Sequence, residues 1–513
     1  MAPLIKKSFL KHYRTGLRYI EDRPDTFIDA NFPKTDTPMG IEDTKYKEHR
    51  LVYKYAMDQL EKDVAQSCEA FYHNLNTLES RPGSQVPFTS INLGRDTSDE
   101  GRLVTKGIFN ASISGIGEHH TTPIFPISIF QYKKGVNANE GDPNYDLMQL
   151  ALESLSRRIY PNFINCDFSE AHEDPNDLDT LFSGMGCRTL MGYDVNGLGY
   201  KRQGRGNNVP NTIILPKLGI EYGICQGKRE KADLDGFWKA FEETLALTEE
   251  GLLERYEIMK RQSPKAAPFM YKNGTIQGAE ECVDNVENAL KHNTLAIGYI
   301  GIAEMCVALF GKNHAEDEEA YKFALKVVER INTFAKEATQ RNSLNFACYA
   351  TPAESLCKTA VNALKEQYGI IPGVTDRAYL TNSHHVPVWV EVSIFKKLEL
   401  EAPFCKFATG GCITYVELDS MFMNNKKAIE KIIHYAFDVL NIPYLAFNFP
   451  IDDCEDCGFS GEITGDICPE CGSPNITRLR RVTGYLTTDY RNFNSGKIAE
   501  VKDRIKHSLV KEN

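Results

Sequence analysis

Four cysteines near the C-terminus have the spacing of a metal site. Two C-x2-C pairs, separated by ten residues, are formed by Cys454, Cys457, Cys468 and Cys471. Each pair can bend through a tight turn and direct two thiolates at one point, and Gly458 and Gly472 permit that turn. Four thiolates make a closed tetrahedral site for structural zinc. The spacing therefore predicts these four cysteines as Zn²⁺ ligands, with disulfides or an iron–sulfur cluster as the alternatives.

The segment around these cysteines needs such a ligand in order to fold. Residues 452–474 are acidic, rich in Gly and Cys, and have almost no apolar periodicity. They cannot form a hydrophobic core by themselves. A zinc ribbon can also bind nucleic acid, but this one has several Asp and Glu and no interleaving of aromatic with basic residues. We interpret the segment as a mechanical element that positions the residues after it.

A fifth cysteine stands in a different setting. The stretch GMGCRTL places Cys187 between small, flexible residues and Arg188, as in the tip of a loop. A lone cysteine is usually a small buried apolar side chain. A thiolate nucleophile with a lowered pKa beside Arg188 is the second interpretation. The residues alone leave both open.

Two other positions gain meaning only from their context. Gly484 lies in the stretch RRVTGYL, shortly after the cysteine-rich segment. Taken alone, it is a glycine in a strand or a turn. Asn207 lies in the stretch GRGNN, where an asparagine is most often a turn former.

Length and composition exclude several classes of protein. The 513 residues carry a formal net charge of -11, with 42% hydrophobic and 25% charged residues. This is a globular balance, and the length requires several domains or one large α/β barrel with attachments. The net charge gives no electrostatic footprint for nucleic acid or an anionic membrane. The N-terminus lacks the apolar core of a signal peptide, and the ten other cysteines are scattered, unlike a secreted disulfide scaffold. We expect a protein of the reducing cytoplasm.

Short apolar segments alternate with longer helical patterns. Strands are expected at residues 86–94, 124–131, 211–220, 386–394 and 444–449, and helices at 46–78, 145–158, 234–259, 296–310, 316–342 and 426–440. Residues 296–310 carry Glu304 and are too short to span a bilayer, so we expect a buried helix there. The alternation is typical of an α/β fold with a mainly parallel sheet.

Together these features resemble the anaerobic ribonucleoside-triphosphate reductases, a family of glycyl radical enzymes. The stretch RVTGYL, followed by NSGK and a basic terminal helix and preceded by the four cysteines, matches the C-terminal signature of that family. Further matches cover nearly the whole chain: KKSFLKH at 6–12, TPIFP at 122–126, MGCR at 185–188, HNT at 292–294, TPAES at 351–355, TNSHHVP at 381–387 and ATGG at 408–411. The resemblance implies a ten-stranded α/β barrel of the glycyl-radical type with a C-terminal zinc ribbon.

The resemblance also implies a radical mechanism. Gly484 would store the radical, because loss of one α-hydrogen leaves a planar centre that a β-carbon would crowd. The radical would pass to Cys187, whose thiyl on the fingertip loop removes the 3′-hydrogen of the ribose. The 2′-hydroxyl then leaves as water, and reduction gives the 2′-deoxy product. In formate-using members, an asparagine in a G-R-x-N stretch helps to hold the substrate and the reductant. Asn207 matches it, with Asn208 leaving the register open, and formate is the expected reductant.

Two segments are candidates for contacts with the substrate. The stretch TPAES opens a helical pattern, and its free backbone N–H groups could bind a phosphate. The same residues could equally begin a purely structural helix. Thr351, Glu354 and Ser355 are the candidates there. Tyr415 and Glu417 follow the glycine pair and would share one side of a strand, although the sequence does not tell which side.

The family also implies partners. The substrates would be ribonucleoside triphosphates, the effectors dNTPs or ATP, and the assembly a homodimer. A separate activating enzyme would carry S-adenosylmethionine and a [4Fe-4S] cluster. In formate-using members a strand with a second active-site cysteine precedes the KKSFxKH segment, which here begins at Lys6. The expectations are a separate N-terminal polypeptide that completes the site or a truncated reading frame, and direct contact with nucleic acid or membrane is not expected.

These expectations define three domains and two alternatives. We expect a catalytic barrel over residues 1–450 with a finger loop near 183–192, a zinc knuckle over 451–475, and a glycyl radical loop with a terminal helix over 476–513. One alternative function is a glycyl-radical lyase, although lyases of the pyruvate type present adjacent cysteines and Cys187 has no cysteine neighbour. The other is a non-enzymatic role, as a zinc-ribbon module or a fragment that is inactive alone.

Overall fold

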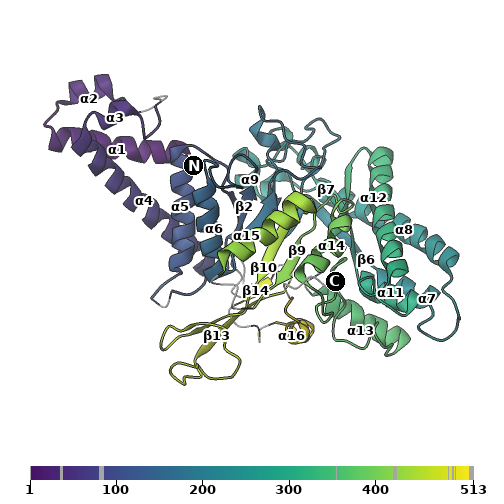
Figure 1. The fold of residues 1–513 in the computed structure, drawn as a ribbon. Coiled ribbons are helices and arrows are strands. Elements are labelled where there is room, and N and C mark those ends of the chain that lie inside the picture. The colour runs from purple at the N-terminus through teal and green to yellow at the C-terminus, as the bar shows by residue number, and fades with distance from the viewer. Residues whose placement is uncertain are drawn as a thin grey trace. The chain divides into compact units, whose positions relative to one another are not determined.

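The computed structural model (Figure 1) describes residues 2–34, 39–79, 86–118, 120–353, 355–419, 425–482, 485–487, 490 and 493–507. The chain divides into two compact units. Unit 1 comprises Met1–Phe163, Ser420–Glu430 and Ile451–Thr477. Unit 2 comprises Ile164–Asp419, Lys431–Pro450 and Arg478–Asn513.

The N-terminal part of unit 1 is a helical layer. It contains α1 (Ala2–Ile20), α2 (Asp25–Asn31), α3 (Thr44–Lys47) and α4 (Arg50–Thr77). Along α4 every fourth residue from Val52 to Tyr72 is buried, which is the stripe that a helix packed on one side requires. The stripe meets α5 (Asp99–Ser114) at Gly107, where a Cβ would lie 2.7 Å from a methyl of Val64. Glycine therefore permits this close helix packing.

The remainder of unit 1 combines a parallel strand pair with a small hairpin. Strand β1 (Ser90–Leu93) pairs in parallel with β2 (Ile127–Tyr132). Helix α6 (Tyr145–Arg158) follows β2 and leads into β3 (Asn162–Asn165). The cysteine-rich segment begins with β11 (Ile451–Cys454) and β12 (Ser460–Gly461), which pair antiparallel.

Unit 2 is built on three parallel strands. Strands β6 (Asn207–Ile214), β7 (Thr294–Ile300) and β8 (Asn345–Ala350) pair in that order. Every residue of β7 and β8 is buried, as expected for parallel strands covered by helices. Their apolar side chains form one core with those of helices α7 (Leu215–Tyr222), α8 (Leu234–Lys260), α11 (Ile302–Phe310) and α12 (Glu318–Asn342).

Further elements of unit 2 surround the candidate site. A second parallel pair is formed by β9 (Thr414–Glu417) and β10 (Tyr444–Asn448), and the hairpin β4 (Gly184–Met185) and β5 (Thr189–Leu190) lies in the same unit. Strand β13 (Ile476–Val482) pairs antiparallel with β14 (Tyr485–Thr487). The other helices of unit 2 are α13 (Leu356–Tyr368), α14 (Ile394–Cys405), α16 (Ser495–Asp503), and the short α9 (Pro268–Lys272) and α10 (Glu287–Leu290). Helix α15 (Lys426–His434) begins in unit 1 and is continued by a π-helix (Tyr435–Val439). Short 3-10 turns span Leu178–Thr180, Pro264–Ala266 and Ala279–Glu281.

Three expectations for secondary structure were wrong in part. The apolar run 296–310 is not one helix: it contains most of β7 and all of α11, joined at Gly301 with a φ of 78°. A buried strand and a buried helix are equally apolar, so periodicity could not separate them. The expected strand 211–220 becomes helix at Leu215, because Pro216 suits a helical first turn. Residues 386–392 form no strand, with a turn at 388–390, and Pro387 offers no N–H to a ladder.

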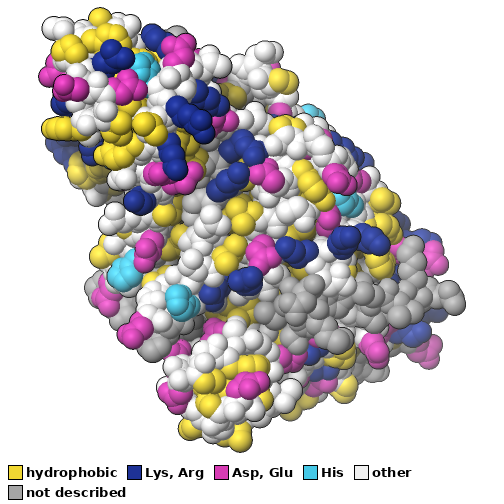
Figure 2. Space-filling view, turned by 60° about the vertical axis from the view of Figure 1, so that its left-hand side comes forward, with side chains coloured by type: hydrophobic (Ala, Val, Ile, Leu, Met, Phe, Trp, Pro, Cys, Tyr) yellow, Lys and Arg dark blue, Asp and Glu magenta, His cyan; other side chains and the backbone are white. Residues whose placement is uncertain are grey.

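The surface agrees with the composition. On the face shown in Figure 2, Lys and Arg side chains are interspersed with Asp and Glu. This fits a sequence that contains 59 Lys and Arg and 70 Asp and Glu residues. Among the described residues, no helix combines the length and the apolar character that crossing a membrane requires.

Candidate active site

Cys187 lies at the tip of the β4–β5 hairpin in unit 2. The hairpin pairs Gly184 with Leu190 and Met185 with Thr189. Gly186 has a φ of 57°, a left-handed conformation that glycine adopts without strain. The Cys187 side chain is partly exposed rather than buried. The position differs from that of an inert core thiol, because a turn presents this sulfur.

Backbone contacts fix this hairpin in place. The Leu190 N–H donates to the carbonyl of Gly410 at 3.1 Å, and the Tyr444 hydroxyl donates to the carbonyl of Gly186 at 3.0 Å. The closest approach is at Gly411, whose φ is 125°: a Cβ there would lie 2.0 Å from the carbonyl oxygen of Arg188. The glycine pair of ATGG is therefore the surface on which the hairpin rests.

Arg188 anchors the hairpin from inside. Its side chain is fully buried, and one terminal nitrogen donates to the carbonyls of Ala350 at 3.0 Å and Thr351 at 3.3 Å. A buried guanidinium held by carbonyls ties the residue after Cys187 to the end of β8. The arginine thus joins the hairpin to the point where the TPAES stretch begins.

Tyr415 and Glu417 face the same cavity. Both are buried on β9, at 7% and 6% exposure, and both line it. Burial raises the pKa of the Tyr415 phenol, and Arg188, Cys187 and Arg481 all lie within electrostatic range of it. The hairpin and the C-terminal end of β13 therefore both lie near one tyrosine.

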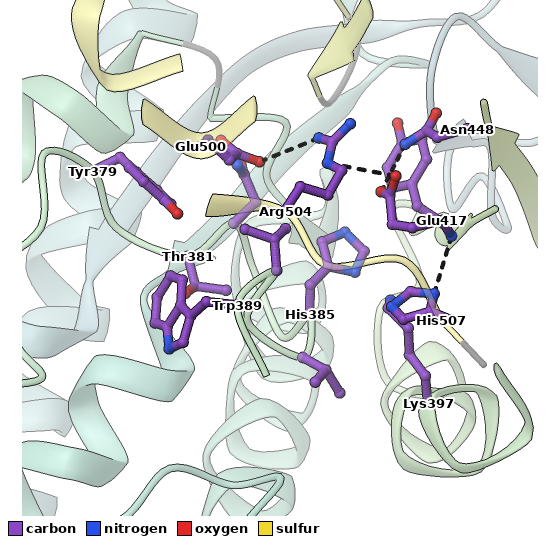
Figure 3. A pocket seen from close by; sticks show the side chains of 14 residues that line it. Tyr379, Thr381, His385, Trp389, Lys397, Glu417, Asn448, Glu500, Arg504 and His507 are labelled. Atoms are coloured by element: carbon purple, nitrogen blue, oxygen red, sulfur yellow. Dashed lines mark hydrogen bonds and ion pairs between the residues drawn. The ribbon is translucent and has the colours of Figure 1, made fainter. Parts of the chain in front are cut away.

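Glu417 is held by the C-terminal segment as well as by the barrel strands. Its carboxylate accepts from Asn448 Nδ2 at 2.8 Å and lies 3.4 Å from Nε of Arg504 (Figure 3). Its backbone N–H donates to His507 Nδ1 at 3.0 Å, and the His507 N–H donates back to its carbonyl at 2.9 Å. Sequence analysis missed Asn448, Arg504 and His507, because only the fold brings them to β9.

Asn207 and Asn208 have different roles in the structure. Both side-chain groups of Asn208 are engaged, Nδ2 with the carbonyl of Leu290 at 2.9 Å and Oδ1 with Nδ2 of Asn293 at 3.0 Å. Asn207 begins β6 opposite Thr294, and its Oδ1 is buried with no hydrogen-bond partner among the described residues. Asn207 is therefore the asparagine with an acceptor still available for a ligand.

The TPAES stretch divides between a buried and an exposed end. The Thr351 hydroxyl is 3.1 Å from that of Thr212, and both lie over Gly298, where a Cβ would be 2.1 Å from Thr351 Oγ1. Ser355 is exposed and precedes α13 without a side-chain capping bond, while the Cys357 N–H in the first turn donates to the carbonyl of Ala353 at 3.3 Å. Glu354 lies outside the described residues, and so does Gly484.

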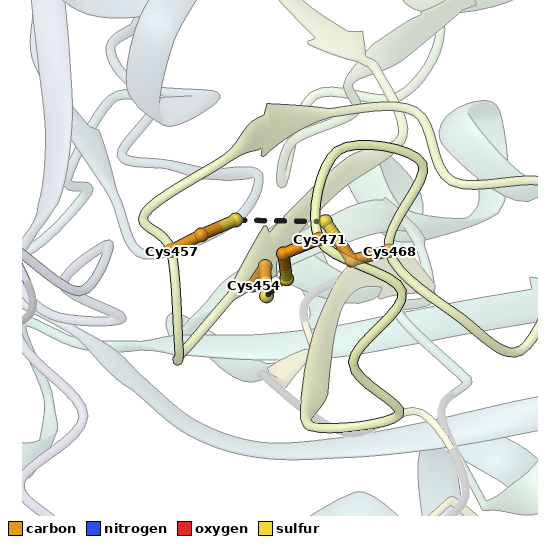
Figure 4. Close-up of side chains that lie close together, drawn as sticks. All are labelled: Cys454, Cys457, Cys468 and Cys471. Atoms are coloured by element: carbon orange, nitrogen blue, oxygen red, sulfur yellow. Dashed lines mark hydrogen bonds between the residues drawn. The ribbon is translucent and has the colours of Figure 1, made fainter.

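The four cysteines of unit 1 form one cluster (Figure 4). Their sulfur atoms all lie within 4.8 Å of one another. The Cys454–Cys471 and Cys457–Cys468 sulfur distances are both 3.6 Å. Zinc–sulfur bonds of about 2.3 Å in a tetrahedron place sulfurs about 3.8 Å apart. The arrangement fits a tetrahedral metal ion better than two disulfides, whose sulfurs would be bonded at about 2.05 Å.

The two halves of this cluster share one turn geometry. The Gly458 N–H donates to the carbonyl of Cys454, and the Gly472 N–H donates to the carbonyl of Cys468, both at 2.9 Å. The two glycines have φ values of 75° and 74°. Each C-x2-C pair therefore forms the tight turn that was expected from the glycine after it.

Comparison with solved structures defines the class. A structure described as an anaerobic ribonucleotide reductase aligns over 98% of this chain and 76% of its own, with a TM-score of 0.66 and 17% identity. The reductase of Thermotoga maritima in complex with dATP and CTP aligns over 93% and 75%, at 0.61 and 17%. A glycyl radical enzyme from Archaeoglobus fulgidus aligns over 98% and 74%, at 0.58 and 14%. The fold is the α/β barrel of the glycyl radical enzymes, as expected.

Comparison of sequences defines the family. The family model described as anaerobic ribonucleoside-triphosphate reductase matches residues 3–507. The reductase of Haemophilus influenzae is 35% identical over 465 residues, which cover 88% of this chain and 63% of that protein. The reductase of phage T4 is 34% identical over 478 residues, covering 91% and 76%. The chain belongs to the anaerobic ribonucleoside-triphosphate reductase family, and it spans 63% of the length of the Haemophilus influenzae relative.

Proposed function

We propose that this protein reduces ribonucleoside triphosphates to 2′-deoxyribonucleoside triphosphates under anaerobic conditions. Gly484 stores the radical and Cys187 carries it to the substrate. The observation that supports this most is the position of Tyr415, which has both Cys187 and Arg481 within electrostatic range. Arg481 precedes Gly484 by three residues in the chain. A short path between the two radical positions is what the chemistry requires.

The proposed reaction balances in atoms and electrons. The Cys187 thiyl removes the 3′-hydrogen, which permits the 2′-hydroxyl to leave as water. Formate then supplies two electrons and a hydrogen and is oxidised to CO₂, and Cys187 returns the hydrogen to the 3′-carbon. With formate as the anion, the sum is ROH + HCOO⁻ + H⁺ → RH + CO₂ + H₂O. One proton per turnover must therefore come from solvent.

Individual residues have proposed roles in that reaction. Asn207 offers its free Oδ1 to substrate or formate. Thr351, Glu354 and Ser355 bind the triphosphate at the start of α13, where backbone N–H groups attract anions. Tyr415 and Glu417 form a wall of the substrate site, and Cys187 lies within electrostatic range of Tyr415. The residues Cys454, Cys457, Cys468 and Cys471 hold a structural Zn²⁺, which their sulfur geometry fits.

The proposed partners follow from the family. A separate activating enzyme with S-adenosylmethionine and a [4Fe-4S] cluster would generate the Gly484 radical. Effectors would be dNTPs or ATP, since one structure of the Thermotoga maritima reductase has dATP bound in the specificity site. We further propose a homodimer, cytoplasmic location and domains at residues 1–450, 451–475 and 476–513.

Electron spin resonance tests the radical assignment without requiring turnover. Anaerobic activation should give a doublet that is split by one α-hydrogen, and Gly484→Ala should remove it. Exposure of the activated protein to air should cut the chain at Gly484 and release about 30 residues, since oxygen attacks a glycyl radical; the length follows from its position. A signal unchanged in Gly484→Ala, or no signal in the unaltered protein, would refute the assignment.

A further inference from the structure

The cavity beside Tyr415 is small, and its lining combines apolar side chains with several polar and charged ones. It measures about 40 Å³ and lies between β9, β10, the 379–389 segment and α16 with the residues after it. A buried water needs about 10–15 Å³ by the same measure, so the space suits two or three waters and not a ribose. Figure 3 shows that its side chains come from both the barrel strands and the C-terminal segment. The cavity therefore differs from a substrate pocket.

Two buried acceptors in its wall have no hydrogen-bond partner among the residues that the structure describes. Asn448 Oδ1 is one of them, and the amide cannot be flipped, because Nδ2 donates to the Glu417 carboxylate and a carboxylate only accepts. His385 Nε2 is the other. Its Nδ1 faces the Glu401 carboxylate at 3.2 Å and must carry the proton, while burial lowers the pKa of the ring and keeps it neutral. Both residues are at least nine-tenths buried, so each acceptor calls for a donor such as water.

Two groups that can move a proton line the cavity. Glu500 lines it from α16, 4.0 Å from Arg504, and burial raises the pKa of its carboxyl to about 7. Tyr415 lines the cavity from β9, and Cys187 lies within electrostatic range of its phenol.

The surroundings of Glu500 explain why it can exchange a proton near neutral pH. Desolvation by burial has the largest effect on the pKa of the Glu500 carboxyl and raises it. Nearby positive charges lower that pKa and nearby negative charges raise it, so their effects partly cancel. The charged and titratable groups that face it are Arg504, Lys497 and Asp503 of its own segment, Glu417 of β9, Tyr379, and Cys357 of α13. Glu500 thus has an opposite charge near it without a close ion pair that would hold it ionised.

We propose that this cavity holds a short chain of ordered waters that carries one proton from Glu500 to Tyr415, and that Tyr415 passes a proton to the departing 2′-hydroxyl. Glu500 is reprotonated from solvent after each turnover. The inference rests on the proposed function, which consumes one proton per turnover with formate. Waters bound to His385 Nε2 and Asn448 Oδ1 are the intermediate links.

The waters and the carboxyl can be tested without turnover. A high-resolution crystal structure should show ordered water within hydrogen-bond distance of His385 Nε2 and of Asn448 Oδ1. Burial raises the pKa of the Glu304 carboxyl to about 7 as well, so infrared difference spectra between pH 6 and pH 8 should show protonated carboxyls that disappear on alkalinisation. Glu500→Gln should remove one of these signals and leave that of Glu304. A dry cavity, or the same carboxyl signals in Glu500→Gln, would overturn the relay whatever the activity of the protein.

Turnover in the activated holoenzyme separates the relay from the proposed function. Below pH 7 Glu500 is protonated and can deliver, so kcat of the unaltered protein should fall as pH rises above 7. Glu500→Gln should lower kcat with formate about tenfold or more and remove that pH dependence. The KM for triphosphate and the radical doublet should stay unchanged. Glu254→Gln, an exposed carboxylate of α8, is the matched control.

The outcomes are distinguishable. No doublet and no turnover in the unaltered protein would count against the proposed function itself. Turnover in the unaltered protein together with an unchanged pH profile in Glu500→Gln would overturn the relay alone. A rise in the KM for triphosphate with kcat unchanged would also overturn it, because Glu500 would then act in binding.

Discussion

Two turns in this protein present cysteine sulfur, and they are held together in opposite ways. In the cysteine-rich segment of unit 1, four sulfurs gather within 4.8 Å, while Cys457 and Cys471 remain exposed. In the β4–β5 hairpin of unit 2, one sulfur stands alone and its backbone is bound on several sides. In the first turn the cysteine side chains converge on one point. In the second, contacts of the surrounding backbone set the position of the single cysteine side chain.

The difference is explained by the role proposed for each sulfur. A structural metal ion needs ligands that converge, and it supplies the folding energy that a segment without a core lacks. A radical carrier needs one sulfur at a fixed place and nothing bonded to it, so the surrounding fold must supply the rigidity. Loss of a ligand should therefore loosen the first turn, whereas loss of a backbone contact should displace the second.

The largest expected effect is on turnover and comes from Cys187→Ser. A hydroxyl cannot take the place of the thiol, because its O–H bond is too strong to exchange a hydrogen atom with the glycyl radical. Turnover should fall below detection, while the glycyl doublet and the unfolding transition stay as in the unaltered protein. Activity assays and electron spin resonance on one sample measure both.

Cys282→Ser is the control for that change, since Cys282 is a partly buried thiol of unit 2 outside both turns. It should retain turnover. Residual turnover in Cys187→Ser that survives removal of contaminating protein would show that the lone sulfur of the hairpin is not the radical carrier.

The second effect concerns the metal and should be confined to the cysteine-rich segment. Cys471→Ser removes one of four ligands, and structural zinc binding is worth on the order of 10 kcal/mol in small zinc modules. The bound zinc should fall from one per chain to a small fraction, and residues 452–474 should become sensitive to protease. Metal analysis and limited proteolysis are the measurements, with Cys282→Ser again as the control.

Hydrogen exchange sharpens the contrast between the two turns. Amides of the hairpin, such as that of Leu190, should remain protected in Cys471→Ser, because their partners lie within unit 2. Equal loss of protection in both turns would contradict the view that each is stabilised separately.

The third effect comes from the glycine beneath the hairpin. Gly411→Ala forces an alanine to a φ of 125° and places a Cβ 2.0 Å from the Arg188 carbonyl, so the hairpin must move. We expect a loss of at least about 2 kcal/mol in the free energy of unfolding and a large fall in turnover. Gly192→Ala is the control, since a Cβ there meets nothing within 4 Å. A fully active Gly411→Ala would show that Cys187 does not depend on its backbone support.

The sequence predicted the architecture better than the detail of the site. Strands and helices differ in the periodicity of their apolar residues, so the α/β class and helices such as 145–158 could be recognised. The two C-x2-C pairs likewise predicted four sulfurs gathered at one point. The buried run 296–310 failed because burial on all sides removes the difference between strand and helix.

Contacts between distant residues carry no sequence signal. The backbone of Glu417 meets the side chain of His507, 90 residues away, and Arg188 meets the carbonyl of Ala350 across 162 residues. The side of β9 that Tyr415 faces depends on these contacts. Alternation alone therefore placed Tyr415 and Glu417 together but could not say what they face.

The smallest effect tests a single hydrogen bond of the hairpin. The Tyr444 hydroxyl donates to the carbonyl of Gly186, next to Cys187, and the tyrosine is otherwise fully buried. Tyr444→Phe removes that donor without changing the ring, so the free energy of unfolding should fall by about 1 kcal/mol. Turnover should fall only a few-fold, because two other hydrogen bonds of the hairpin remain. They are the bond from the Leu190 N–H to the carbonyl of Gly410 and the bond from Arg188 to the carbonyl of Ala350.

Chemical denaturation and initial rates measure the two consequences of Tyr444→Phe. Tyr193→Phe, which alters a tyrosine that is 57% exposed, should stay within about 0.5 kcal/mol of the unaltered protein. If Tyr444→Phe changed stability but not turnover, the bond would serve the fold alone. A fall in turnover larger than that of Gly411→Ala would reverse the order of importance proposed for the supports of Cys187. The bond at the tip of the hairpin, from Tyr444 to Gly186, would then position the sulfur more than the contact at Gly411 does.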